Sequence, residues 1–292
     1  MSDAASEPSL AGAFWAPLPD WSALRVAGPD AAAFLQSFCT NDVAALRPGE
    51  ACEAFFTDVK AHVLAYTTVA RDEAARDETG FSCVLSSPHA GRLGEHLDRY
   101  LIREDVELAV ETRPLALLGA AAPAAEHEAP AAGWGAGVRI ALGAAPVGGA
   151  VELGAAELER LRLRLGVPRD AIDVDERNLP QEVDRNEQAI SFTKGCYLGQ
   201  EPVARIDALG RVNRLLRGVR IDGPTPNAGD ELFVGEGGKP IGRVTSATDL
   251  PAGDAQTRSV ALAYVRREHA EAGTAVVVGG SPGTVSPLPM AD

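Results

Sequence analysis

Apolar and polar positions in the first part of the chain alternate between strand-like and helix-like spacing. Apolar residues three and four positions apart indicate amphipathic helices, whereas short apolar runs bounded by turn residues indicate strands. These rules predict a helix at residues 29–38, strands at 53–59, 63–70, 81–85 and 106–110, and a helix that starts at Pro88. Strands and helices interleaved in this way predict an α+β body.

The middle of the chain is less regular. Residues 119–137 are rich in alanine, proline and glycine and have no sustained apolar period, which predicts a linker or a surface loop. Leucines at helical spacing predict a helix over residues 153–165, ended by Gly166. The stretch 169–191 is polar and irregular, and such a stretch inside a compact protein is more often functional than idle.

From about Leu215 the pattern changes to short apolar strands separated by glycine turns. Such a run of strands predicts a small antiparallel barrel or sandwich. We therefore expect two domains: an α+β body at residues 1–213, which includes the loop or linker at 119–137, and a C-terminal β-barrel domain at residues 214–292.

Composition narrows the class of protein. The 292 residues are 46% hydrophobic and 23% charged, without a long apolar run, so we expect a soluble protein with no membrane segment. The acidic N-terminus resembles neither a secretory signal nor a transit peptide. Four scattered cysteines without a CxxC spacing argue against a disulfide framework or a zinc site, and together these features predict a cytoplasmic protein.

The formal net charge of −14 disfavours direct binding to nucleic acid, which depends on clustered lysine and arginine. One region departs from this balance. It contains five arginines, namely Arg205, Arg211, Arg214, Arg217 and Arg220. We interpret them mainly as internal ion pairs or a solvated strand face. The alternative is a local anion site, suited to a phosphate, a glutamate tail or a short RNA contact.

The stretch KGCYLGQEPVARI, residues 194–206, has the strongest chemical character in the chain. Gly195 and Gly199 permit sharp turns and a close approach to a ligand. The Glu-Pro pair at 201–202 predicts the first turn of a helix, and Gly210 is its expected stop.

Cys196 would lie just ahead of that helix, where the helix dipole and Lys194 both favour a thiolate that reacts or binds a metal. The alternative is a small buried hydrophobe, which a single cysteine more often is. One cysteine cannot complete the coordination of zinc or of a cluster, so we assign no metal site; a partner or a small thiol would supply the other ligands. We also assign no catalytic histidine, because the five histidines share no metal-ligand spacing.

KGCYLGQE resembles the signature of the YgfZ family of folate-binding, iron–sulfur cluster maintenance proteins, also called tRNA-modifying proteins, which are relatives of the glycine cleavage T-protein. FLQSFCTNDVAAL, LRLRLGVPRDAID and LPQEVD are similar to other parts of that family, and IGRVTSA is similar to the T-protein barrel. The resemblance implies a T-protein-like (GcvT-type) fold, in which an α+β body of intertwined subdomains and a C-terminal antiparallel β-barrel surround a folate site.

The resemblance also implies a set of site residues. Cys196 would be the functional thiol, with Lys194 beside it, and Glu182 resembles the carboxylate that grips the pterin ring through two charge-assisted hydrogen bonds. The alternative for Glu182 is a helix cap or an ion pair. With Glu182, the residues expected to contact folate are Asn41, Tyr197, Gln200, Glu201 and Arg205.

One departure from the aminomethyltransferase pattern bears on the reaction. Those enzymes carry an acid that assists attack of the folate amine, and our register places Ala65 at that position. Without a positioned acid or base, the step would be slower by about 10²- to 10⁴-fold. We therefore expect no classical turnover, and the alternative is a folate-dependent aminomethyl or N-methyl transferase that uses a base elsewhere.

Together with the resemblance, these residues predict a tetrahydrofolate-binding accessory protein that supports iron–sulfur cluster assembly or repair in client enzymes, including tRNA-modifying ones. Cys196 would transiently bond a cluster, a persulfide or a client thiol beside the bound folate. The expected cofactor is tetrahydrofolate or a derivative, and the expected partners are iron–sulfur client enzymes and cluster-assembly proteins. A third hypothesis is a direct RNA-binding module built on the arginines between 205 and 220.

Overall fold

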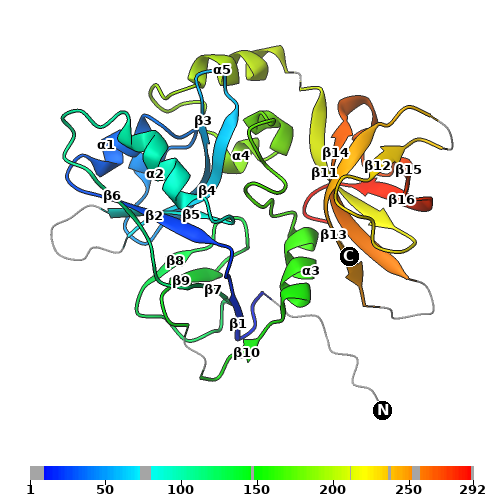
Figure 1. Cartoon of the computed structure of the whole chain (residues 1–292), viewed down its shortest axis with the longest axis horizontal. Coiled ribbons are helices and arrows are strands. Elements are labelled where there is room, and N and C mark those ends of the chain that lie inside the picture. Colours follow the sequence, from blue (N-terminus) through cyan, green and yellow to red (C-terminus); the bar gives the residue numbers. More distant parts are fainter. Residues whose placement is uncertain are drawn as a thin grey trace. The chain divides into compact units, whose positions relative to one another are not determined.

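The computed structural model describes residues 10–72, 80–145, 148–210, 212–235, 238–251 and 257–290. The chain forms two compact units, whose elements Figure 1 labels in chain order. Unit 1 comprises Met1–Leu35, Val43–Glu53 and Thr68–Leu161, and unit 2 comprises Gln36–Asp42, Ala54–Thr67 and Arg162–Asp292. Unit 2 thus joins two early segments to the second half of the chain. The division at residue 213 stays a prediction.

The strands of the first half of the chain belong to two sheets. One has the order β10-β1-β7-β9-β8, with strands β1 (Phe14–Pro17), β7 (Leu115–Leu118), β8 (Glu128–Pro130), β9 (Arg139–Leu142) and β10 (Val151–Glu152). The other has the order β3-β4-β5-β2-β6, with strands β2 (Ser22–Ala27), β3 (Ala51–Thr57), β4 (Val63–Arg71), β5 (Gly80–Leu85) and β6 (Glu107–Val110).

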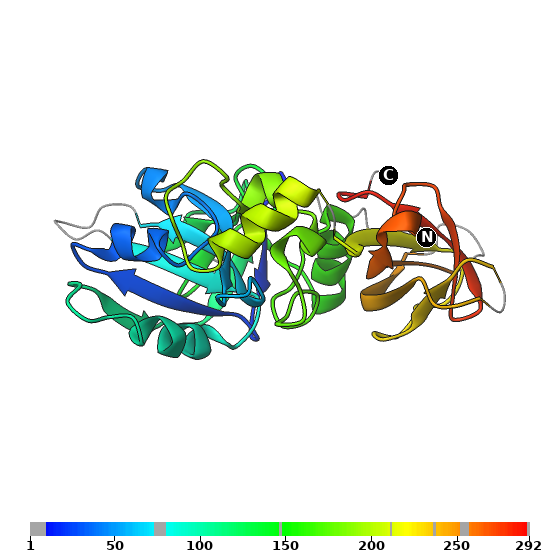
Figure 2. The same cartoon turned by 90° about the horizontal axis from the view of Figure 1, so that it is seen from above.

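Two helices and one 3-10 helix accompany these sheets: α1 (Ala31–Gln36), η1 (Val43–Ala45) and α2 (Ala90–Asp98). Helix α2 buries Leu93 and Leu97 and packs on β2 and β6, which lie beside it in Figure 2. These elements confirm the helices and strands predicted for the first 110 residues. Among the helices of the described ranges, none has both the length and the apolar character that crossing a membrane requires.

Residues 119–137 are mostly turns and irregular backbone, as the loop alternative predicted, but they also carry a strand and a buried tryptophan that a linker would lack. They contain β8, in which Ala129 pairs with Ile140 of β9. They also contain Trp134, which is 2% exposed and whose ring centre lies 6.3 Å from that of Trp21. Alanine, proline and glycine are depleted in strands, so the composition concealed a short strand that pairing with its neighbour stabilises.

The C-terminal part of unit 2 is a closed antiparallel barrel with the order β11-β14-β13-β12-β15-β16, coloured yellow to red in Figure 1. Its elements are β11 (Arg214–Ile221), β12 (Glu231–Phe233), β13 (Gly242–Leu250), β14 (Arg258–Arg266), η3 (Arg267–His269), β15 (Ala275–Val278) and β16 (Ser281–Ser286). These elements confirm the predicted α+β class with a C-terminal antiparallel β-barrel.

Strand β14 contributes side chains to two cores, because successive residues of a strand point to opposite faces. Ala263 and Val265 pack among other barrel residues, whereas Leu262 and Tyr264 belong to a second core. That second core also includes residues of the elements that precede the barrel: α3 (Ala155–Leu165), η2 (Pro180–Val183), α4 (Asn186–Ala189) and α5 (Gln200–Leu209). One face of the barrel strand therefore supports the irregular stretch that precedes the signature.

Candidate functional site

Cys196 lies on an exposed loop that leads into helix α5. Gly199 has a φ of 83° at the N-cap of this helix, and Gly210 has a φ of 60° at the C-cap. The predicted helix and its glycine stop are thus confirmed. Cys39 and Cys83 are buried. The interpretation of Cys196 as a small buried hydrophobe is wrong, because its side chain faces solvent.

The two glycines of the loop differ in what they require. A Cβ at Gly199 would lie 2.5 Å from the carbonyl oxygen of Asp58 and closer still to Thr57, whereas a Cβ at Gly195 would meet no atom within 4 Å. Thr57 Oγ1 also donates to the carbonyl of Leu198 at 2.9 Å. The loop therefore lies against the end of β3, and the close approach at Gly199 requires glycine.

Lys194 holds the other side of the loop. Its side chain is buried, and Nζ donates to the carbonyl oxygens of Cys39 at 2.8 Å and of Asn41 at 2.6 Å. Nζ also lies 5.1 Å from the centre of the Tyr197 ring, within cation–π range. Lys194 thus ties the loop that carries Cys196, residues 195–199 (the thiol loop), to residues 39–41. Its predicted effect on the Cys196 thiolate stays a prediction.

The loop that contains Asn41 is bonded to the segment around α4. Asn41 Nδ2 donates to the carbonyl of Gln188 at 2.8 Å. Thr40 Oγ1 donates to the carbonyl of Ala189 at 2.6 Å and accepts from the Phe55 amide at 2.9 Å. The Asn41 amide therefore has a partner within the chain, and its predicted contact with folate stays a prediction.

Cys39 and Tyr197 are buried, unlike Cys196, and burial changes the pKa of both groups. Burial raises the pKa of the Cys39 thiol, and the nearby ammonium of Lys194 offsets only part of that shift. Burial also raises the pKa of Tyr197 to about 12, with a smaller contribution from Cys39. Both groups therefore stay protonated near neutral pH, which disfavours them as nucleophiles.

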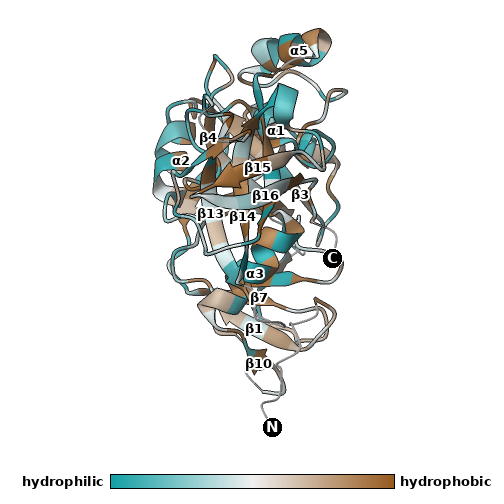
Figure 3. Cartoon of the chain, turned by 90° about the vertical axis from the view of Figure 1, so that its right-hand side faces the viewer, coloured by the Kyte–Doolittle hydropathy of each residue, from teal (hydrophilic) through white to brown (hydrophobic). Residues whose placement is uncertain are grey.

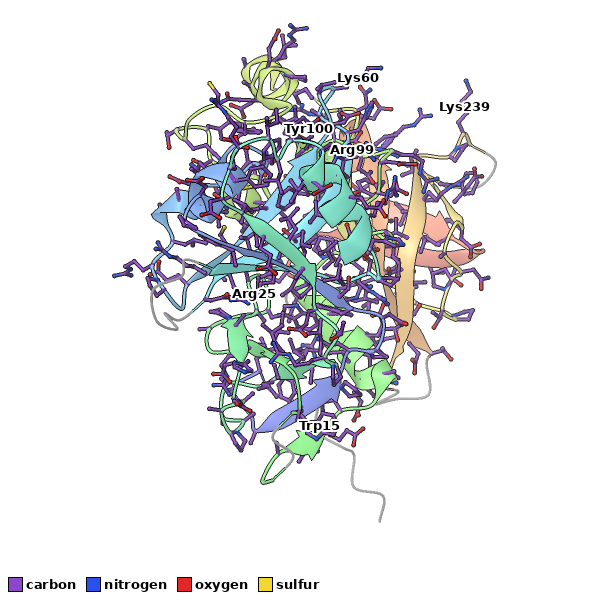
Figure 4. The ribbon with its side chains drawn as sticks, turned by 60° about the vertical axis from the view of Figure 1, so that its left-hand side comes forward. Trp15, Arg25, Lys60, Arg99, Tyr100 and Lys239 are labelled. Atoms are coloured by element: carbon purple, nitrogen blue, oxygen red, sulfur yellow. The ribbon has the colours of Figure 1, made fainter. Side chains whose placement is uncertain are left out.

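Replacing Lys194 with methionine is expected to lower the free energy of unfolding by about 1.5–3 kcal/mol, because two buried carbonyl groups lose a charged donor. Urea unfolding measures the change. Lys60→Met is the matched control, since Lys60 is exposed and projects outward in Figure 4, and there we expect a change of about 0.5 kcal/mol or less. Equal effects of the two substitutions would contradict the anchoring role of Lys194.

Glu182 lies in η2 and is 7% exposed. Its Oε2 accepts hydrogen bonds from Arg214 at 2.9 Å, from the Leu179 amide at 3.3 Å and from Asn178 Nδ2 at 3.4 Å. Within the described part of the chain, Oε1 accepts none. Oε2 therefore serves as both cap and ion-pair partner, which were the alternatives for this residue, and its predicted contact with folate stays a prediction.

Tyr264, which was not among the residues predicted from the sequence, shares the Arg214 guanidinium with Glu182. Tyr264 of β14 is 6% exposed, and among the described residues its hydroxyl has no hydrogen-bond partner. The Arg214 guanidinium lies 4.8 Å from the centre of the tyrosine ring. Burial raises the pKa of Tyr264 well above its ordinary value, and the charges of Asp173 and Glu182 add to the shift. In the sequence, the only signal was strand alternation, which turns Tyr264 away from the alanines of the barrel.

Helix α5 and the short helix η2 contact each other directly. Gln181 Nε2 donates to the carbonyl of Val203 at 2.8 Å, and both residues are buried. Next to this contact, the Val63 amide donates to the carbonyl of Asn178, whose side chain bonds Glu182. The helix that follows the thiol loop therefore packs on the helix that presents Glu182, within unit 2.

The other residues predicted to bind folate lie on α5, which carries both hydrophilic and hydrophobic residues in Figure 3. Gln200 opens the helix and is partly buried. Glu201 and Arg205 are exposed and pair with each other at 2.8 Å, one helical turn apart. Such a pair is typical of a solvated helix face. Their predicted contacts with folate stay predictions.

The arginines between residues 205 and 220 are largely engaged within the chain. Arg205 and Arg214 make the contacts described above, and Arg217 pairs with Asp184. Arg211 lies outside the described residues. Ion pairs account for these three side chains, of which the Arg205 pair is exposed and typical of a solvated face, and Arg220 is exposed on β11.

Comparisons with known proteins place this geometry in a family. Residues 214–292 match the family of the glycine cleavage T-protein C-terminal barrel domain. The chain is 30% identical over 255 residues to the iron-sulfur cluster assembly factor IBA57 of Homo sapiens, which covers 75% of this chain and 70% of that protein. It is also 30% identical over 306 residues to a Haloarcula marismortui protein named "Probable aminomethyltransferase", with 89% and 81% covered.

Other similarities are shorter or concern the fold. The chain spans 31% of the length of a chloroplastic relative from Arabidopsis thaliana, to which it is 32% identical over 146 residues. The solved aminomethyltransferase T of Bartonella henselae matches with a TM-score of 0.78 over 97% of this chain and 88% of that chain, at 19% identity. Proteins named tRNA-modifying protein YgfZ align as well. This chain belongs to the T-protein-related family that includes YgfZ and IBA57.

Proposed function

We propose that this protein is a tetrahydrofolate-binding accessory factor that supports the assembly or repair of iron–sulfur clusters in client enzymes, including tRNA-modifying ones. The observation that carries the proposal is an exposed Cys196 on a loop fixed by Lys194, ahead of a helix packed on the Glu182 segment. The names of two relatives, a cluster assembly factor and a tRNA-modifying protein, point to the same process. Its partners are client enzymes and cluster-assembly proteins.

The proposed step is a ligand exchange at a cluster iron. The Cys196 thiol releases its proton to solvent, its thiolate forms a bond to one iron, and another ligand leaves that iron, so no electron is transferred. The described residues contain no group of three or more histidine, cysteine, aspartate or glutamate side chains that could hold a metal ion. The client or a small thiol therefore supplies the remaining ligands of the cargo cluster.

The residues around Glu182 fit a pterin ring. Glu182 offers Oε1 as an acceptor, and Tyr264 offers a buried hydroxyl that lacks a partner among the described residues. Oε1 can accept a charge-assisted hydrogen bond from the amino-pyrimidine edge of folate, which is stronger than a neutral one, whereas Oε2 already accepts from three donors. Bound folate would supply one-carbon or reducing chemistry there. The residues of this chain would bind and orient it.

Cys196→Ser is expected to abolish the rescue of client-enzyme activity in cells that lack the protein, because the hydroxyl of serine does not replace a thiolate as an iron ligand. Cluster content of a purified client, measured by iron analysis and visible absorbance, gives the result directly. Cys52→Ser is the control, since Cys52 is only partly exposed and lies in β3, and it should rescue fully. Full rescue by Cys196→Ser would remove the thiol from the function.

A second candidate function is a folate-dependent one-carbon transferase. The relative named as an aminomethyltransferase favours it, whereas Ala65, which is 2% exposed in β4, offers no group to move a proton. Incubation with tetrahydrofolate and an aminomethyl or N-methyl donor separates the two candidates. Multiple turnovers would support the transferase, and their absence together with Cys196-dependent rescue would support the accessory factor.

A further inference from the structure

The hydroxyl of Tyr264 is not explained by the packing of the protein. Tyrosine and phenylalanine fill nearly the same space, so a phenylalanine would pack this core without leaving a buried polar atom. A buried hydroxyl that lacks a partner destabilises a fold. Tyr264 therefore carries a hydrogen-bond donor that the described part of the chain does not use.

The two carboxylates that act most strongly on this hydroxyl, those of Asp173 and Glu182, already accept hydrogen bonds from other groups. Oδ2 of Asp173 accepts from Arg162 and from the Arg169 amide, and its Oδ1 accepts from two barrel hydroxyls. Oε2 of Glu182 accepts from three donors, including Arg214. The Tyr264 hydroxyl is left as a donor, and Oε1 of Glu182 is left as an acceptor.

We propose that the Tyr264 hydroxyl donates a hydrogen bond to an acceptor atom of the ring whose N–H groups bind Glu182. This inference rests on the proposed folate binding and adds a recognition residue to it. A 2-amino-4-oxopteridine carries both kinds of atom, because its amino and ring N–H donors are flanked by a ring nitrogen and a carbonyl oxygen. The Arg214 guanidinium over the tyrosine ring steadies the ring in this position.

Tyr264→Phe in the full-length protein tests the proposal. Phenylalanine keeps the ring and its contact with Arg214 and removes the hydroxyl alone. Anaerobic titration calorimetry with tetrahydrofolate should give a Kd about 3- to 10-fold weaker than that of the wild type. Without ligand, the thermal midpoint of the variant should be equal or higher, because a buried polar atom without a partner is gone.

Ser259→Ala is the matched control. Ser259 lies on the same strand, is 1% exposed, and its hydroxyl already bonds the carbonyls of Gly223 and Pro224 at 3.3 Å each. Removing it should lower the thermal midpoint and leave the Kd for tetrahydrofolate unchanged. Tyr264→Phe is thus expected to weaken binding without lowering the thermal midpoint, and Ser259→Ala to lower the midpoint without weakening binding.

The outcomes separate this inference from the proposed function. Wild-type binding with an unchanged Kd for Tyr264→Phe would overturn the role of Tyr264 and leave folate binding standing. A weaker Kd accompanied by a lower midpoint would reveal a packing defect and overturn it as well. No binding by the wild type would refute the proposed folate binding, and the role of Tyr264 with it.

Discussion

Asp173→Ala is expected to lower the free energy of unfolding by about 3–5 kcal/mol. The Asp173 side chain is 0% exposed, and it accepts from Arg162, whose side chain is 2% exposed, at 2.7 Å. Oδ2 also accepts from the Arg169 amide at 2.9 Å. Alanine would leave the guanidinium of Arg162 buried without its carboxylate. Desolvated charge without a counter-ion is among the most destabilising changes in a protein interior.

The same carboxylate also holds the barrel strand β13. Oδ1 accepts from the hydroxyls of Thr245 and Ser246, the latter at 2.6 Å. These residues lie where the pairing of β13 with β14 shifts register, between Val244 and Ser246. The loss of Asp173 therefore removes support from an irregular point of the barrel as well as from α3.

Guanidinium chloride unfolding followed by circular dichroism measures this prediction. Asp222→Ala is the control, because Asp222 and Arg258 are 3.9 Å apart with side chains 72% and 62% exposed. An exposed pair of this kind contributes less than about 1 kcal/mol. A loss of the same small size for Asp173→Ala would mean that desolvation cancels the attraction in the buried pair. Asp173→Leu with Arg162→Met, which buries no charge, should recover much of the lost stability.

Gly199→Ala is expected to lower the free energy of unfolding by about 2–5 kcal/mol and to abolish rescue of client enzymes. Its φ of 83° is unfavourable for a residue with a Cβ. The added Cβ would lie 2.5 Å from the Asp58 carbonyl oxygen, so the loop or the end of β3 has to move. Movement of this loop displaces Cys196, and functional loss follows from the same strain.

Gly195→Ala is the matched control. It tests whether the damage comes from the close contact of Gly199 with the end of β3 or from replacing any glycine of the signature. It lies one residue from Cys196, it is exposed, and a Cβ there meets no atom within 4 Å. Its stability and rescue should match those of the wild type. Chemical unfolding and the cellular rescue assay are read for both variants side by side. Equal damage by the two substitutions would mean that the contact with β3 is not what fixes the loop.

Much of the fold could be predicted from local signals. Helix α5 was predicted from a proline in its first turn and a glycine at its end. Both signals are local, because they lie within about ten residues of each other. The barrel followed from short apolar runs separated by glycine turns. Strand β8 did not, because alanine and proline carry no strand signal and its stability comes from pairing with β9.

The sequence named candidate site residues, but it did not specify the partners that the structure gives them. Lys194 was expected to act on Cys196, two positions away, yet its ammonium bonds the carbonyls of residues 39 and 41. The cap and the ion pair, which were the alternatives to a folate contact for Glu182, are both formed at Oε2. Tyr264 lies in an apolar strand run, and its polar neighbours come from other segments. Such contacts depend on the fold, which local patterns do not specify.

The hydrogen bonds between Lys194 and residues 39–41 can form only late in translation, after the second half of the chain has been synthesised. Cys39 and Lys194 are 155 positions apart, so at about 5–20 residues per second the ribosome needs on the order of 10–30 s to deliver the lysine. During that interval the nascent chain carries Cys39 without the ammonium that later covers its carbonyl. A thiol that is sealed in the finished protein is therefore open to oxidants and chaperones while translation continues.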